Sequence, residues 1–175
     1  MQQSRRAVVV ALAGIGSGCV GTRQSSPATT ESDTDGDGIP DHADRYPNDP
    51  RRAFRDQSRE GTYTLHPGQF SATALTNSPQ ASGKVLHYEA EVEGDTEVDC
   101  LVFEREAYDA YAAGDRDVSI VSEYSRTGIT ETTLTRTLDE GEYLFSLDYT
   151  RQVTDPGEQS VTVNHFLELA EPADQ

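Results

Sequence analysis

The side chains of Val85-Leu86-His87-Tyr88-Glu89-Ala90-Glu91-Val92 alternate with a period of two. Successive side chains of an extended chain point to opposite faces. One face would carry Leu86, Tyr88, Ala90 and Val92, and the opposite face would carry the histidine and the two glutamates. This pattern predicts a β-strand with one buried face and one solvent-facing side.

The same period continues on both sides of this stretch, from residue 61 to residue 168, and predicts further strands. The candidate strands are Thr62–His66, Gln69–Leu75, Val85–Val92, Glu97–Phe103, Val118–Tyr124, Ile129–Leu138, Tyr143–Thr150 and Val161–Leu169. Turn sequences such as Asp139-Glu140-Gly141 and Asp155-Pro156-Gly157 separate them. Eight short strands in about 110 residues are typical of an antiparallel β-sandwich. The fold class is therefore mainly β, with the sandwich over residues 61–170 and a tail at 171–175.

One segment has the composition of a helix. Residues 104–113 read Glu-Arg-Glu-Ala-Tyr-Asp-Ala-Tyr-Ala-Ala, and Gly114 follows as a helix-ending glycine. Val98-Asp99-Cys100-Leu101-Val102-Phe103 precedes this segment, and Leu138 to Phe145 includes Gly141 and Tyr143. These two features resemble the strand-then-helix and the Leu-x-x-Gly-x-Tyr hairpin of GOLD-like and pre-peptidase C-terminal domains. The resemblance implies a β-sandwich used for interaction.

Five aspartates in a regular register precede the β region. Residues 33–44 read Asp-Thr-Asp-Gly-Asp-Gly-Ile-Pro-Asp-His-Ala-Asp, with Gly38 at position 6. Ca²⁺ takes six to eight oxygen ligands, and alternate carboxylates can surround one ion where a glycine permits the sharp turn. We predict a calcium-binding loop at residues 33–50. The expected ligands are the carboxylates of Asp33, Asp35, Asp37, Asp41 and Asp44 and the carbonyl of Ile39. The alternative is an acidic linker.

The loop differs from an EF-hand, because proline follows it at Pro47 and Pro50 and the segment before it is poor helix material. With Tyr46-Pro47-Asn48-Asp49-Pro50 it is similar to a single thrombospondin type 3 repeat. That resemblance implies the same calcium ligands. The departures are that a lone copy is present and that no cysteine lies near Tyr46.

The N-terminus has the features of an export signal. Ser4-Arg5-Arg6 precedes a nine-residue apolar run, and Gly16-Ser17-Gly18-Cys19 follows it. Residues 1–19 resemble twin-arginine lipoprotein signals of haloarchaea and bacteria, although Gly16 stands where that pattern prefers Leu or Val. The resemblance implies lipid attachment at Cys19, with free secretion as the alternative. Residues 20–32 are rich in Ser, Thr and Pro and predict a flexible stalk. Residues 51–60 predict a short charged link.

The charge balance argues against nucleic acid as a partner. The net charge is −17, from 31 acidic and 14 basic residues, and Lys84 is the only lysine. Such a field disfavours nucleic acid, which requires clustered Lys and Arg. High salt would screen the self-repulsion, so the composition suggests a salt-loving organism.

No catalytic motif stands out. The four histidines are scattered, and we expect structural roles for them. Glu89, Glu91 and Glu93 alternate on one strand face and could mimic a glycosidase carboxylate pair. A cleft that gathers Glu89, Glu91 and a histidine would favour an enzyme. Cys100 is expected to be a small buried hydrophobe. Core packing is the expected role of Tyr108, Tyr111, Tyr124 and Tyr149, with a sugar- or peptide-binding surface as the alternative.

We therefore expect an exported, lipid-anchored, non-catalytic calcium-binding protein on the outer face of the cell membrane, or secreted from the cell. Its partners would be membrane lipid through Cys19 and a surface protein or glycan bound by the sandwich. The alternative is an accessory domain or small secreted enzyme that acts on polysaccharide or peptide with a partner. A surface-layer subunit is a third possibility, and it would carry a large apolar patch on one sheet face.

Overall fold

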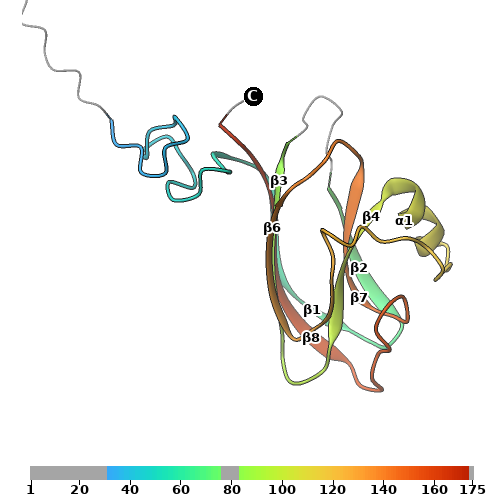
Figure 1. Ribbon diagram of the computed structural model, residues 1–175. Coiled ribbons are helices and arrows are strands. Elements are labelled where there is room, and N and C mark those ends of the chain that lie inside the picture. Colours follow the sequence, from blue (N-terminus) through green and yellow to red (C-terminus); the bar gives the residue numbers. More distant parts are fainter. Residues whose placement is uncertain (1–30, 76–82, 174–175) are drawn as a thin grey trace, which may run out of the picture. The chain divides into compact units, whose positions relative to one another are not determined.

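The computed structural model describes residues 31–75 and 83–173. Their strands form two antiparallel sheets of four strands each. The strands are β1 (Phe54–Leu65), β2 (Gln69–Leu75), β3 (Val85–Val92), β4 (Val98–Glu104), β5 (Arg126–Ile129), β6 (Glu131–Thr137), β7 (Tyr143–Tyr149) and β8 (Val161–Glu171), and the helix α1 is Arg105–Ala112. One sheet has the order β1-β8-β3-β6, and the other has the order β2-β7-β4-β5. The two sheets face each other (Figure 1), which confirms the predicted antiparallel β-sandwich. The predicted export signal, Cys19 and residues 20–30 of the predicted stalk lie outside the described residues.

The core lies between the two sheets. On β3 the face predicted to be buried is buried, from Leu86 to Val92, whereas Glu89 and Glu91 are exposed. Tyr88 is fully buried and donates its hydroxyl proton to the carbonyl of Tyr124, so its polar atom is satisfied inside the core. Each large apolar side chain removed from water here stabilises the fold by about 1.5–3 kcal/mol.

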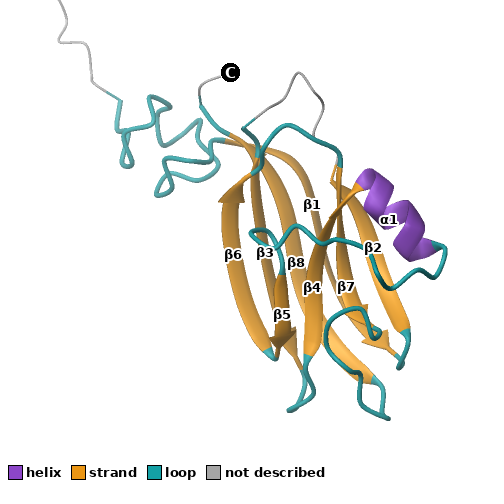
Figure 2. Ribbon diagram, turned by 45° about the vertical axis from the view of Figure 1, so that its right-hand side comes forward, coloured by secondary structure: helices purple, strands orange, loops and turns teal. Residues whose placement is uncertain are grey.

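A second apolar cluster lies on the outer face of the β2-β7-β4-β5 sheet, beneath α1. Leu101, Phe103 and Tyr111 form its buried part, and the Phe103 and Tyr111 rings stack with their centroids 4.7 Å apart. Figure 2 shows α1 against this sheet. Because β7 is covered on both faces, all seven of its residues are buried and its alternation disappears.

The structure corrects two of the predicted segments. The charged link predicted at 51–60 is mostly strand, since β1 begins at Phe54 and pairs with β8 over its whole length. The strand predicted at 118–124 is absent from the described chain, and the short strand β5 pairs with β4 instead. Val118 and Ile120 pack against the cluster beneath α1, which explains their apolar character without a strand.

Several other sequence predictions for the described region are confirmed, although the strand predicted at Ile129–Leu138 is divided between β5 and β6. The helix lies where it was expected, and Gly114 just beyond it has a φ of 104°, a left-handed conformation that favours glycine. Cys100 is buried and free, and burial raises the pKa of its thiol. Among the predicted tyrosines Tyr111, Tyr124 and Tyr149 are core residues. In residues 31–75 and 83–173, no helix is long and apolar enough to cross a membrane.

Candidate metal centre

The loop of residues 33–44 folds around its own aspartate side chains. Asp33 accepts two backbone hydrogen bonds, from the Gly36 nitrogen to Oδ1 at 2.8 Å and from the Gly38 nitrogen to Oδ2 at 3.0 Å. Gly38 has a φ of 93°, which an L side chain rarely adopts, so glycine at position 6 permits the turn. The carboxylate at position 1 therefore sets the curvature of the loop.

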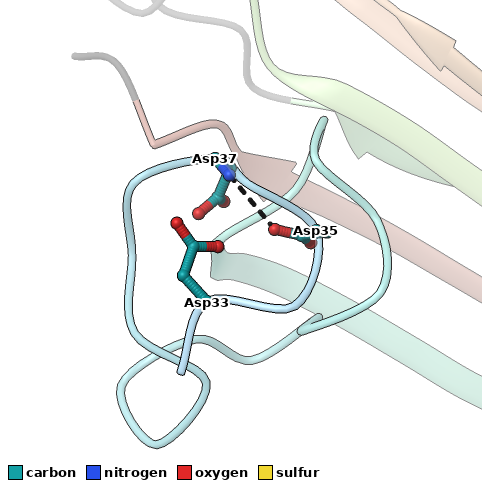
Figure 3. Close-up of side chains that lie close together, drawn as sticks. All are labelled: Asp33, Asp35 and Asp37. Atoms are coloured by element: carbon teal, nitrogen blue, oxygen red, sulfur yellow. Dashed lines mark hydrogen bonds between the residues drawn. The ribbon is translucent and has the colours of Figure 1, made fainter. Parts of the chain in front are cut away.

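Three carboxylates converge inside this curve. Asp33, Asp35 and Asp37 each offer an oxygen, and these oxygens lie within 4.8 Å of one another. In Figure 3 the three side chains point toward one another from different sides of the loop. Such an all-carboxylate set suits a hard divalent cation such as Ca²⁺ or Mg²⁺, whereas zinc sites favour histidine and cysteine.

Within the described chain, three aspartates of the loop each keep one carboxylate oxygen without a hydrogen-bond partner. Asp35, Asp37 and Asp44 each use Oδ1 to accept the backbone N–H two residues further on. The Oδ2 atom of each is buried and has no hydrogen-bond partner within the described residues. A buried carboxylate oxygen without a donor is costly. A cation held by Asp33, Asp35 and Asp37 would give the unpaired oxygens of Asp35 and Asp37 a partner, so the residues present fit a metal ion.

The remaining predicted ligands are placed differently. Asp41 accepts from Thr34 at both oxygens, from its nitrogen at 2.7 Å and its hydroxyl at 2.8 Å, and it is outside the converging group. Hydrogen bonds from the Ser32 and Thr34 hydroxyls lower the pKa of the Asp41 carboxyl. The Ile39 nitrogen donates to Asp37 Oδ1 at 2.8 Å, and its carbonyl stays a predicted ligand. Asp41 therefore braces the loop in this structure.

Burial and the neighbouring negative charges both act on the Asp35 carboxyl. Partial burial raises the pKa of the Asp35 carboxyl above its ordinary value. The negative charges of Asp37 and Asp44 raise that pKa further, whereas the Asp37 N–H lowers it. Asp44 is thus within electrostatic range of Asp35, although it lies nine residues further along the chain. A cation at this position would be attracted by four carboxylates, those of Asp33, Asp35, Asp37 and Asp44.

A groove of about 400 Å³ lies on the β1-β8-β3-β6 sheet. It is lined by residues from all four strands, among them Glu60, Glu89, Glu91, Glu131, Asn164 and His165. The two glutamates of β3 that the sequence singled out line this groove. The His165 side chain is on the other face of the sheet, because its strand partner is the core residue Ala90 and its ring lies against Tyr63. Glu60 and Glu131 join the two glutamates through strand pairing, which no local pattern reveals.

The histidines have structural surroundings. His165 is buried, with Nδ1 3.1 Å from the Gly61 carbonyl and its ring against Tyr63. Burial lowers the pKa of His165, so the ring is neutral at pH 7. His87 lies 2.8 Å from the Thr135 hydroxyl and 3.3 Å from a Glu89 carboxylate oxygen. His42 and His66 are exposed.

Comparison with protein-family models gives no match, and comparison with curated protein sequences also gives none.

Proposed function

We propose that the chain is an exported, lipid-anchored cell-surface protein that binds one Ca²⁺ in the loop of residues 33–44 and uses its β-sandwich as an interaction module. The observation that supports the ion is the set of three buried, unpaired Oδ2 atoms on Asp35, Asp37 and Asp44. Asp35 and Asp37 converge with Asp33, and their carboxylate oxygens are the hard ligands that Ca²⁺ prefers.

The proposed role of the ion is mechanical. Asp33, Asp35, Asp37 and Asp44 would hold it, with Ile39 and Asp41 as the further ligands that the sequence predicts. The positive charge would offset the repulsion among these carboxylates and fix the loop ahead of β1. Isolated extracellular calcium modules bind with dissociation constants of about 10⁻⁴–10⁻³ M, so we expect a constitutive structural ion.

Titration calorimetry on the chelator-treated full chain tests the metal site. We expect one Ca²⁺ per chain, and we expect the double variant D35N/D37N to lose the binding heat. The matched control is E140Q/E142Q, which removes two exposed acidic groups outside the loop and should leave binding unchanged. The metal proposal is overturned if the wild-type chain gives no heat, or if both double variants bind equally.

Lipid attachment has its own test. In a prokaryotic host with twin-arginine export, the wild-type chain should fractionate with the membrane. Cys19→Ser should release it, because the thiol is the atom that would be acylated. A conservative variant of the buried thiol, Cys100→Ala, serves as the control and should remain with the membrane. Equal membrane retention of Cys19→Ser would contradict a lipid anchor.

A second function is favoured by the groove on the β1-β8-β3-β6 sheet, which Glu89 and Glu91 line. It would be an accessory domain or small enzyme acting on polysaccharide or peptide. The glutamates are exposed, whereas His165 is held by Gly61 and uncharged. Binding of oligosaccharides without turnover would support the interaction module. Hydrolysis that E89Q/E91Q abolishes would instead establish the enzyme.

A further inference from the structure

A buried carboxylate on β8 connects the sandwich to the segment that follows the metal loop. Glu168 is 1% exposed, and both of its oxygens are paired with arginines. Arg52 Nη1 donates to Oε1 at 3.2 Å, and Arg55 Nε donates to Oε2 at 2.9 Å. Because a buried charge is costly unless it is paired, Glu168 requires these arginines to stay in place.

Arg52 also contacts Tyr46, which is hydrogen-bonded to the candidate metal ligand Asp44. The Arg52 guanidinium lies over the Tyr46 ring, 4.5 Å from its centroid, and the Tyr46 nitrogen donates to Asp44 Oδ1 at 2.7 Å. The other oxygen of Asp44 is one of the three that are buried and unpaired. Three contacts therefore lead from Glu168 through Arg52 and Tyr46 to Asp44.

Backbone hydrogen bonds run beside this chain of side chains. The Arg45 nitrogen donates to the Ala53 carbonyl at 3.0 Å, and the Ala53 nitrogen donates to the Glu171 carbonyl at 2.9 Å. Ala53 is fully buried. The end of the metal loop is thus attached to β8 by main chain as well as by side chains.

We propose that Glu168 is a positioning residue for the cation site, which couples occupancy of the loop to the stability of the sandwich. This inference rests on the proposed calcium site. Glu168 holds Arg52, Arg52 holds the Tyr46 ring, and the Tyr46 nitrogen fixes the carboxylate of Asp44 through Oδ1, which leaves Oδ2 free. Coupling between two parts of a protein is reciprocal, so a bound ion must stabilise the sandwich by the same factor by which the intact contacts tighten ion binding.

The test measures Ca²⁺ affinity and calcium-dependent melting on the full chain with two variants. Glu168→Gln removes the buried charge that both arginines share and, among the described residues, leaves Arg52 only its ion pair with Asp49 at 3.0 Å. We expect Ca²⁺ to bind about tenfold more weakly. Arg52→Met removes the link to Tyr46 while Arg55 still pairs Glu168, so the sandwich remains folded, and we expect a similar loss. In both variants the rise in Tm on adding Ca²⁺ should shrink.

Asp56→Asn is the matched control, because the Asp56 carboxylate pairs with the buried Lys84 ammonium at 2.7 Å within the sandwich. It should lower Tm equally with and without Ca²⁺ and leave the affinity unchanged. Affinities within twofold of wild type for both Glu168→Gln and Arg52→Met would overturn the inference while leaving the calcium site intact. If the wild-type chain binds no Ca²⁺, the proposed function itself is wrong.

Discussion

At the scale of single residues, two buried carboxylates face each other on β4 and β7. Asp99 and Asp148 are paired across the strands, and each is 1% exposed. Asp99 accepts from Gly128 and Thr154, and Asp148 accepts from Thr150 and from the Tyr111 hydroxyl. Burial raises the pKa of Asp148 to about 6, and the charge of Asp99 contributes to that rise.

This shift has a direction that stability measurements can check. Between pH 4 and pH 6 the folded chain holds a proton on Asp148 that the unfolded chain has released, so stability falls as the pH rises through this range. The raised pKa corresponds to a loss of roughly 2–3 kcal/mol in the free energy of unfolding across this range. We expect D148N, measured against wild type by urea unfolding, to gain relative stability of that size from pH 4 to pH 7. Parallel pH profiles for the two proteins would contradict this.

At the scale of elements, α1 covers the outer face of the second sheet through one tyrosine. Tyr111 is fully buried, and its ring contacts Phe103 and Phe70. Tyr108 on the preceding turn is half-buried. The helix has eight residues, too few to be stable alone, so this packing holds it.

Tyr111→Ala should therefore lower the free energy of unfolding by about 3–5 kcal/mol, because it opens a cavity beneath the helix. Tyr108→Ala should lower the free energy of unfolding clearly less, since solvent already reaches that ring. Urea denaturation of both variants at pH 7 measures the difference. Equal and small losses would show that α1 is not anchored by Tyr111.

The sequence predicted those elements whose own residues carry the signal. β3 alternates because Glu89 and Glu91 on its outer face are exposed, and Gly114 follows the end of α1. The first half of β1 has no apolar period because it is an exposed edge strand, ordered by pairing with β8. The converging aspartates lie within five residues and were predictable from their spacing. The contact between Arg52 and Glu168 spans 116 residues and has no local pattern.

At the scale of the whole molecule, the net charge of −17 opposes compaction. Raising the NaCl concentration from 0.1 M to 1 M shortens the screening length from about 10 Å to about 3 Å. We expect Tm to rise over this range, and KCl to give the same rise because the effect is one of ionic strength. A falling Tm would show that ion pairs such as those of Glu168 outweigh the general repulsion.

A crystal structure grown with Ca²⁺ would show whether one ion occupies the loop of residues 33–44. The account predicts one anomalous scattering peak among Asp33, Asp35, Asp37 and Asp44, with carboxylate oxygens about 2.3–2.6 Å from it. Well-ordered carboxylates at these positions with no peak between them, at millimolar Ca²⁺, would contradict the account.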